Sequence, residues 1–161
     1  MNEDTIHIGV IADTHTILRP QVVSAFRGVS RIIHAGDVGS PMVLNELQNI
    51  APVHAVRGNV DQGRWANRLP PNDIVEVGGV LIYVLHDLDD LMLAPKAAGF
   101  AAVVHGHSHK PDIDYRDGVL YLNPGSAGPR RFTNPITVAR LEVAAGNLRP
   151  EIISLESPAS Q

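Results

Sequence analysis

The residues best suited to chemistry lie directly after apolar segments of the chain. His107 and His109 follow the apolar residues 101–104, within the segment His105-Gly106-His107-Ser108-His109. Gly106 allows a tight turn and a close approach of the backbone to a ligand, and side chains two residues apart on an extended segment project from the same face. This spacing suits two ligands of one metal site. Taken alone, it is equally compatible with the polar end of a strand.

Four other apolar segments end in the same way, with carboxylate, imidazole or amide side chains. Segments of this kind, rich in isoleucine and valine and too short for typical helices, favour strands that are buried on both faces. Ligands of open α/β sheets bind beyond the carboxyl ends of the strands, so we expect these side chains to meet at one edge. Together with the two histidines above, the set is Asp13, His15, Asp37, Asn59, His86, His107 and His109.

This donor set predicts a site for divalent metal ions. Two carboxylates, four imidazoles and one amide suit manganese, iron, zinc, cobalt or nickel better than ions that prefer thiolates or oxygen alone. Seven ligands are too many for one small ion, whereas a carboxylate can bridge two. We therefore expect two divalent metal ions, with manganese as the leading candidate. Four further histidines lie within or beside apolar runs and are expected to pack or to form hydrogen bonds: His7, His34, His54 and His105.

Length and composition indicate a single globular domain over residues 1–161. The chain has 161 residues, of which 44% are hydrophobic, and it has no cysteine, which fits a reducing compartment. Its first residues are acidic and polar, unlike a signal peptide, and no apolar run approaches membrane-spanning length. We therefore expect a cytoplasmic protein without membrane contact. A formal charge of -4 without a basic block gives no indication of nucleic-acid binding.

The expected elements alternate between strands and helices in the first half and form hairpins in the second. Strands are expected at residues 6–12, 31–35, 52–56, 73–77, 80–85, 101–105, 113–115, 119–122, 136–143 and 148–155. Helices are expected at residues 20–28, at residues 40–49 with Ser40 as the cap, and at residues 89–98. Paired turn residues at 78–79, 117–118 and 146–147 predict three hairpins. Residues 62–72 are interpreted as a surface loop and residues 157–161 as a frayed tail.

Five motifs occur in a fixed order along the chain. They are Asp13-Thr14-His15, Gly36-Asp37, Gly58-Asn59-Val60-Asp61, His86 and Gly106-His107-Ser108-His109. In this order they resemble the calcineurin-like metallophosphoesterases, whose pattern is D-x-H, G-D, G-N-H-D, H and G-H-x-H. The resemblance runs from Ile8 to about Arg130. It includes Asn123-Pro124-Gly125-Ser126, which is found in the small prokaryotic phosphodiesterase branch of the family.

The resemblance implies an α/β fold of two mixed β-sheets packed face to face with helices on the outside, a four-layer αββα sandwich. It implies a phosphoric ester hydrolase in which a dinuclear metal centre activates a water or hydroxide for attack on a phosphodiester. It places Asp13, His15, Asp37 and His109 on one metal and Asp37, Asn59, His86 and His107 on the other, with Asp37 as the bridge. The resemblance also implies that Asp37, Asn59 and His107 act in catalysis.

Three positions at the motifs need separate interpretation. Val60 stands where many relatives have histidine, and valine cannot donate a proton to a leaving alkoxide, a contribution of about 10²- to 10⁴-fold. This favours diesters over monoesters as substrates. Asp87 stands where relatives commonly have glycine, and it is expected either to cap a helix near Asp89 or to orient an imidazole of the metal site. Asp61, which orients the missing histidine in the family, is expected to be structural or to orient Asn59.

Substrate contacts are expected from basic and amide side chains, because an arginine fork binds phosphate oxygens well. The candidates are Arg57, Asn123 and Arg130, with Arg64 and Trp65 from the surface loop. The expected partner is a small phosphodiester, and the exposed strand edges of the expected fold permit homo-oligomers. Two alternatives stay open. One is a protein-binding scaffold with weak or no activity, resembling the retromer-subunit relative of these diesterases, and the other is a phosphomonoesterase or a dinucleoside-polyphosphate hydrolase. Retention of all seven ligand positions favours the catalyst over the scaffold.

Overall fold

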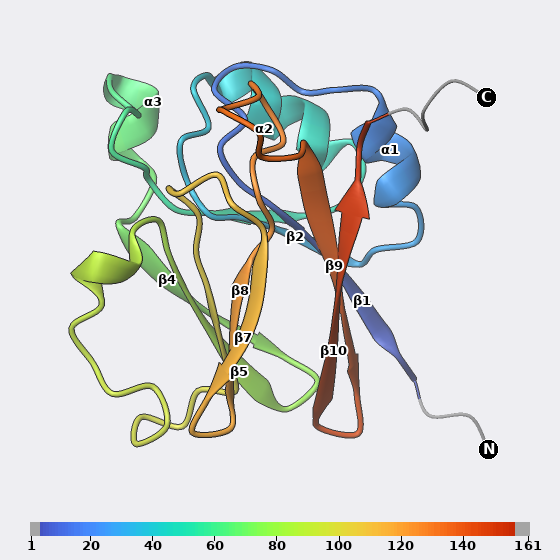
Figure 1. Cartoon of the computed structure of the whole chain (residues 1–161), viewed down its shortest axis with the longest axis vertical. Helices are drawn as coiled ribbons and strands as arrows, with labels where there is room; N and C mark the ends of the chain where they lie inside the picture. Colours follow the sequence, from blue (N-terminus) through green and yellow to red (C-terminus); the bar gives the residue numbers. More distant parts are fainter. Residues whose placement is uncertain (1–3, 157–161) are drawn as a thin grey trace.

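The computed structural model describes residues 4–156 and contains two five-stranded β-sheets (Figure 1). The first sheet has the strand order β10-β9-β1-β2-β3. In it, β1, β2 and β3 run parallel, whereas β9 is antiparallel to β1 and β10 is antiparallel to β9. Its strands are β1 (Ile6–Ile11), β2 (Arg31–His34), β3 (Val53–Ala55), β9 (Thr137–Ala144) and β10 (Asn147–Ser154).

The second sheet has the strand order β4-β5-β6-β8-β7. Its three central strands β5, β6 and β8 run parallel, and β4 and β7 are antiparallel edges. Gly78 and Gly79 join β4 to β5 with φ of 56° and 83°, the left-handed conformations of a two-residue hairpin turn, so this hairpin is confirmed. The strands are β4 (Asn72–Val77), β5 (Val80–Leu85), β6 (Ala102–Val104), β7 (Asp112–Arg116) and β8 (Val119–Asn123).

Two helices cover the outer face of the first sheet. Val22 of the first helix and Leu47 of the second are buried in one cluster with Ile11 and Ile32 of the sheet. The second helix begins as expected, because the Ser40 side chain accepts a hydrogen bond from the backbone N–H of Met42. No helix within residues 4–156 is long and apolar enough to cross a bilayer. The helices are α1 (Gln21–Ala25), α2 (Pro41–Gln48), α3 (Arg64–Asn67) and the 3-10 helix η1 (Leu88–Asp90).

The main hydrophobic core lies between the two sheets. Val10 and Ile33 of the first sheet share one buried cluster with Ile82, Val104 and Leu122 of the second. These β-branched and leucine side chains alternate along their strands with residues that face outward. The expected pair of mixed sheets packed face to face is therefore confirmed, and this packing sets the carboxyl ends of parallel strands from both sheets beside each other.

The prediction of a helix at residues 89–98 is wrong. Only η1 forms there, and turns and irregular backbone follow it up to Phe100. Pro95 lies in the middle of the expected helix, where it lacks an N–H donor and disfavours helical backbone in the residue before it. Leu91 and Leu93 nevertheless pack against Phe100 on the outer face of the second sheet. This face is thus covered by an irregular segment with a single short 3-10 helix.

Three smaller differences concern loops and the tail. The loop expected at residues 62–72 contains the four-residue helix α3, which is too short to produce a periodic sequence pattern. The last hairpin turns at Ala145 and Gly146, with φ of 52° and 78°, one residue earlier than expected at 146–147. The tail expected to fray, residues 157–161, lies outside the described residues.

Candidate metal centre

The candidate ligands lie on loops that follow strands of both sheets. Backbone pairing continues beyond the strands, because the N–H of Asp13 donates to the carbonyl of Gly36 and the N–H of Gly106 donates to the carbonyl of His86, each at 3.0 Å. Neighbouring loops are therefore held side by side at the end of the sheets, as the sequence predicts. Asp13 and His15 follow β1, Asp37 follows β2, Asn59 follows β3, His86 follows β5, and His107 and His109 follow β6.

Most of these residues have a backbone conformation that is unusual outside glycine. Left-handed backbone of this kind costs about 1–3 kcal/mol per residue and persists where the surrounding structure enforces it, often at functional sites. Because several left-handed residues occur together on these loops, we treat this end of the sheets as a candidate functional site. Values of φ between 46° and 74° occur at Asp13, His15, Asp37, His107 and His109.

The first group of converging donor atoms contains Asp13, His15 and His109. His15 Nε2 lies 3.2 Å from His109 Nε2, and Asp13 Oδ1 lies 3.9 Å from the former and 3.6 Å from the latter. Asp13 is fully buried, and its Oδ1 has no hydrogen-bond partner among the described residues. A buried carboxylate oxygen without a partner is costly, and a cation among these three atoms would satisfy it.

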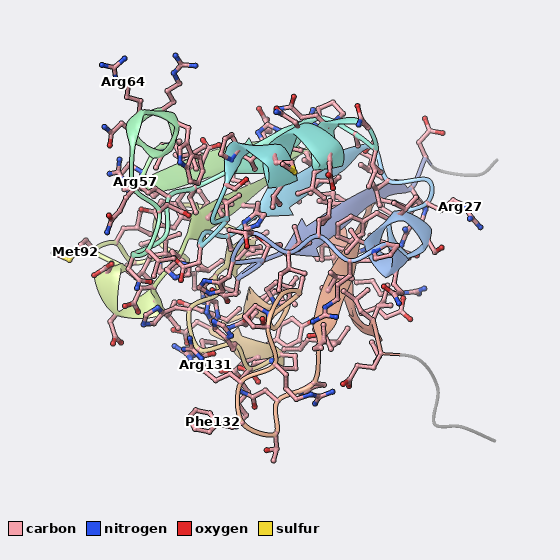
Figure 2. The ribbon with its side chains drawn as sticks, turned by 90° about the horizontal axis from the view of Figure 1, so that it is seen from above. Arg27, Arg57, Arg64, Met92, Arg131 and Phe132 are labelled. Atoms are coloured by element: carbon pink, nitrogen blue, oxygen red, sulfur yellow. The ribbon has the colours of Figure 1, made fainter. Side chains whose placement is uncertain are left out.

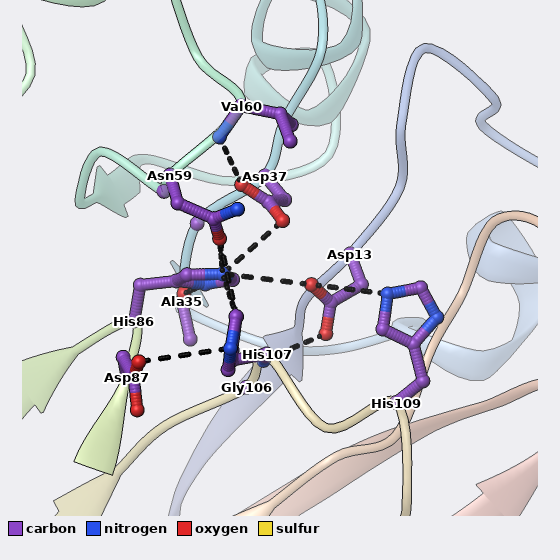
Figure 3. A network of polar contacts seen from close by, with 12 residues as sticks. Asp13, Ala35, Asp37, Asn59, Val60, His86, Asp87, Gly106, His107 and His109 are labelled. Carbon is purple, nitrogen blue, oxygen red and sulfur yellow. Dashed lines mark hydrogen bonds and ion pairs between the residues drawn. The ribbon is translucent and has the colours of Figure 1, made fainter. Parts of the chain in front are cut away.

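The second group contains Asp37, His86 and His107, with the amide of Asn59 beside them (Figure 3). His86 Nε2 lies 3.2 Å from Asp37 Oδ2, 2.9 Å from Asn59 Oδ1 and 3.3 Å from His107 Nδ1. On the other side of its ring, His86 Nδ1 donates to the carbonyl of Ala35 at 2.8 Å. This hydrogen bond directs Nε2 toward the group and fixes the ring orientation.

Asp37 lies between the two groups. Its Oδ2 is 3.7 Å from His15 Nε2 in the first group and 3.2 Å from His86 Nε2 in the second. Its Oδ1 accepts a hydrogen bond from the backbone N–H of Val60 at 3.0 Å. A Cβ atom on Gly58 would lie 2.1 Å from Asp37 Oδ1, so only glycine permits this approach. The Asp37 carboxylate therefore lies within 4 Å of a donor atom of each group.

Burial and mutual contact shift the protonation of the donor groups. Burial raises the pKa of Asp13 to about 7, against the opposing effect of His86. Burial also opposes ionisation of Asp37, but hydrogen bonds from His86 and from the Val60 amide outweigh it and lower its pKa. Burial likewise opposes the charged form of His86, but contact with Asp37 raises its pKa. Protons on Asp13 and His86 thus compete with a cation for the same atoms.

A buried chain of hydrogen bonds links the first two ligand loops. The N–H of Gly36 donates to His34 Nδ1 at 3.1 Å, so His34 Nε2 carries the proton and donates to Thr14 Oγ1 at 3.0 Å. The Thr14 hydroxyl then donates to the carbonyl of Val38 at 2.8 Å. Complete burial lowers the pKa of His34 to about 3, which keeps the ring neutral. His34 therefore holds together the loops that carry the two carboxylates.

Three further histidines, His7, His54 and His105, lie outside the two donor groups. His7 lies 3.7 Å from Glu142 and His54 lies 3.9 Å from Asp73. His105 is buried, and burial lowers its pKa to about 4. Within residues 4–156, neither donor group includes any of them, and the buried Nδ1 of His7 and Nε2 of His105 have no hydrogen-bond partner among the described residues.

Asp61 fixes the loop after β3. Its carboxylate accepts hydrogen bonds from the backbone N–H groups of Gly58 at 2.9 Å, Val38 at 3.2 Å and Gly39 at 2.9 Å. The carboxylate is thus occupied by backbone, which is the structural one of the two roles expected for it. The Val60 side chain, at the neighbouring position, is 45% exposed and offers no polar atom to the centre.

Arg57 lies beside the second donor group. It lines a cavity of about 210 Å³ together with Asn59, His86 and Asp87. Of the two other candidates on this side, Arg64 points away from the molecule in Figure 2. Trp65 packs against the cluster beneath α2. Of Arg57, Arg64 and Trp65, only Arg57 lines the cavity beside the second donor group.

The other two expected substrate contacts are engaged elsewhere. Asn123 is 1% exposed, and its amide donates to the carbonyl of Gly106 at 3.1 Å and to Ser108 Oγ at 3.0 Å. It therefore holds the loop that carries the two histidines. Arg130 forms an ion pair with Glu156, which follows β10, and donates to the carbonyl of Asn134 on its own loop.

Arg131 is the residue that the sequence interpretation missed. Burial is the largest cause of the lowered pKa of His109, and the positive charge of the Arg131 guanidinium is the second largest. The same charge acts against the rise in the pKa of Asp13. Figure 2 shows Arg131 and the exposed Phe132 on one loop, well apart from Arg57. The sequence contains no signal that distinguishes Arg131 from Arg130, because the ion pair that turns Arg130 aside is a tertiary contact.

The fold and the paired donor groups correspond to one protein family. The sequence model of the calcineurin-like phosphoesterase superfamily domain matches residues 6–146. The chain belongs to the calcineurin-like phosphoesterase superfamily. This confirms the family resemblance, and it makes the protein a metallophosphoesterase whose two His and Asp groups fit metal ions.

One sequence relative and two solved structures extend the comparison of this phosphoesterase. A probable metallophosphoesterase of Methanothermobacter thermautotrophicus is 35% identical over 163 residues, covering 94% of each chain. The solved structure of an archaeal phosphodiesterase has a TM-score of 0.77 and 26% identity, covering 92% of this chain and 100% of that one. Vacuolar protein sorting 29 of Cryptosporidium parvum has a TM-score of 0.75 and 18% identity, covering 93% and 98%. The last likeness concerns the fold alone.

Proposed function

We propose that this phosphoesterase hydrolyses a small phosphodiester at a centre of two divalent cations. Manganese is the leading candidate, and iron, zinc, cobalt and nickel are alternatives. The observation that carries the proposal is the position of Asp37 Oδ2, within 3.7 Å of His15 Nε2 in one donor group and 3.2 Å of His86 Nε2 in the other. The similarity to an archaeal phosphodiesterase supports the choice of a diester.

The proposed ligand sets follow the two donor groups. The unpartnered Oδ1 of buried Asp13 and the Nε2 atoms of His15 and His109 suit one cation. The chemistry of the second group, with two imidazoles, one amide and one carboxylate, suits the other. The sets are Asp13, His15, Asp37 and His109 for the first cation and Asp37, Asn59, His86 and His107 for the second.

Two divalent cations in one site supply a water of lowered pKa and stabilise both the entering and the leaving oxygen of a displacement at phosphorus. The protein contributes charge and geometry. Asp13 and Asp37 are the two anionic members of the ligand sets, so they leave a net positive site that attracts a phosphate group. Arg131 adds positive charge near His109. Asn59 and His107 lie beside His86 and complete the face that we assign to catalysis.

The absence of a proton donor at position 60 favours diesters with good leaving groups. The backbone of Val60 binds Asp37, and its side chain cannot protonate a leaving alkoxide. The cavity beside the second donor group gives room for one ester substituent. Its lining includes the cation of Arg57, the side chains of Tyr83 and Leu85, and the carboxylates of Asp87 and Asp90.

The experiment is a substrate panel on the metal-free and reloaded full-length chain. After chelation, the protein is loaded with each candidate metal and assayed with a diester, a monoester and a pyrophosphate. We expect the highest turnover with the diester and a strict requirement for metal. Asp37→Asn should reduce turnover by more than about 100-fold, whereas Asp117→Asn, the same change on the β7–β8 turn, should not. A lack of metal-dependent diester turnover under all conditions would overturn the proposal.

A protein-binding scaffold is the second candidate function. The observation that favours it is the shared fold with vacuolar protein sorting 29. A scaffold requires no intact ligand set, yet both donor groups are complete here. The scaffold hypothesis expects no turnover with any metal, so the same substrate panel separates the two functions. A phosphomonoesterase, a single domain over residues 1–161, self-association and a cytoplasmic location stay predictions from the sequence.

A further inference from the structure

Asp87 lies where the second donor group meets the adjoining cavity, and its two carboxylate oxygens face different partners. Oδ1 accepts a hydrogen bond from the backbone N–H of Asp89 at 3.0 Å and caps η1. Oδ2 lies 3.6 Å from His107 Nε2, as Figure 3 shows. One side chain therefore contacts both the start of a helical turn and the ring of a candidate ligand.

His107 is the least buried of the four imidazoles in the donor groups. Its side chain is 44% exposed, compared with 21% for His15, 5% for His86 and 1% for His109. Its Nδ1 lies 3.1 Å from Asn59 Oδ1, so this nitrogen faces the donor group and Nε2 faces Asp87. The donor group therefore contacts the inner nitrogen of the ring, and Asp87 is the polar side chain that faces the outer one.

We propose that Asp87 is a positioning residue that orients His107 for the second cation. A proton on Nε2, held by the Asp87 carboxylate, leaves the lone pair of Nδ1 directed at the centre, and a carboxylate partner makes the imidazole a stronger ligand. The 3.6 Å separation is longer than a hydrogen bond, so the proposal requires the two side chains to move closer together when the centre is loaded. This inference rests on the proposed two-cation centre.

The capping role and the orienting role use different atoms, so substitution can separate them. Serine at position 87 can still cap η1 but is too short to reach His107. Alanine removes both roles. Asp89→Asn removes the same charge two residues away, on an exposed side chain, and controls for general electrostatics. Among the described residues, no other carboxylate lies within 4.0 Å of a His107 ring nitrogen.

The first measurement is the affinity of the chelated full-length chain for manganese, determined by titration calorimetry. We expect two sites in the wild type. Asp87→Ser and Asp87→Ala should both weaken one site by about 10- to 100-fold and leave the other unchanged. Asp89→Asn should retain both affinities.

The second measurement is the tautomer of His107 in the zinc-loaded chain, read from long-range proton–nitrogen NMR correlations of the ring. We expect the Nε2–H form in the wild type and in Asp89→Asn. In Asp87→Ser we expect a mixture of tautomers or a displaced ring signal, which a merely structural role in capping η1 would not produce.

The outcomes distinguish this inference from the proposed function. If the wild type binds two ions and both Asp87 variants match it, the positioning role is overturned and the two-cation centre stands. If only Asp87→Ala loses affinity, capping of η1 is the whole role of Asp87, and the inference is equally overturned. If the wild type fails to bind a second ion, the proposed centre and this inference both fall.

Discussion

Val60 contributes its backbone, and not its side chain, to the candidate centre. Its N–H holds Asp37 Oδ1 at 3.0 Å, while its side chain is 45% exposed beside the donor groups. A larger polar side chain can therefore be accommodated at this position without disturbing the hydrogen bond. The side chain at position 60 can thus be changed without changing the position of Asp37.

Val60→His should raise monoesterase activity relative to diesterase activity. An imidazole at this position can protonate a poor leaving group, which typically contributes about 10²- to 10⁴-fold, and we expect the ratio to rise by at least about tenfold. The measurement is kcat/KM for an alkyl monoester and an activated diester with the metal-loaded enzyme. Val60→Ala is the matched control, and an unchanged ratio in the histidine variant would contradict the assignment.

Metal affinity should fall as the pH is lowered through 7. Burial raises the pKa of Asp13 to about 7, so below that pH a cation must displace its proton, at a cost of about tenfold in affinity per pH unit for each proton. Above pH 8 the carboxylate is already ionised and this dependence disappears. Calorimetry in buffers of different ionisation enthalpy should show more protons released on binding at pH 6 than at pH 8. An affinity that is constant from pH 6 to 8 would refute this expectation.

At the level of elements, the loops after the strands are held by hydrogen bonds that the strands themselves do not provide. The series of hydrogen bonds from Gly36 through His34 and Thr14 to Val38 connects the loop after β1 with the loop after β2. Asp61 joins the loop after β3 to the same place through three backbone N–H groups. The positions of the candidate ligands therefore depend on residues that lie outside both donor groups.

Thr14→Val should destabilise the fold although the two side chains have nearly the same shape. The substitution leaves the His34 N–H and the Val38 carbonyl buried without their partner, which costs about 1–3 kcal/mol. The free energy of unfolding from urea titration is the measurement, with the exposed Thr5→Val as control. Equal stability of the two variants would show that this chain of hydrogen bonds does not support the loops.

Arg131→Ala should weaken substrate binding more than Arg130→Ala. Arg131 acts electrostatically on His109, whereas Arg130 is paired with Glu156, so only the former has its charge available for a phosphate group. A hydrogen bond to a charged group is worth about 1.5–3 kcal/mol, and we expect KM for a diester to rise about tenfold with kcat little changed. Equal effects of the two substitutions would remove Arg131 as a substrate contact.

The strand ends could be predicted from the sequence because each combines an apolar run with a polar terminus. The helix prediction at residues 89–98 failed for a different reason, because Pro95 in the middle of the segment disfavours helical backbone. Contacts such as Arg130 with Glu156 or Asp87 with His107 join residues far apart in sequence or on adjacent loops. No local pattern encodes them, so the choice between neighbouring arginines required the structure.

At the level of the whole molecule, the donor groups draw on both sheets. Asp13 and His15 come from the first sheet and His109 from the second, while Asp37 of the first sheet meets His86 of the second. Each group therefore crosses the interface between the sheets at the end of the main core. A cation in either group would tie the two sheets together.

Chelation should therefore lower the thermal unfolding midpoint. A ligand at about 100 times its Kd stabilises the folded state by about 2.7 kcal/mol, which for a chain of this size corresponds to about 5–10 °C. Thermal unfolding of chelated and manganese-loaded protein is the measurement, and Asp37→Asn should show a smaller difference. Identical midpoints at saturating manganese would argue against cations that connect the sheets.

The position of β1 has a consequence for the order in which the protein can be completed during synthesis. β1 pairs with β2 on one side and with β9 on the other, so its second edge has no partner until residues 137–144 have left the ribosome. An unpaired edge of this kind invites pairing with other chains. Before residues 137–144 are synthesised, the edge of β1 that pairs with β9 is exposed. Products that stop before residue 137 should therefore aggregate more readily than the chain that contains β9.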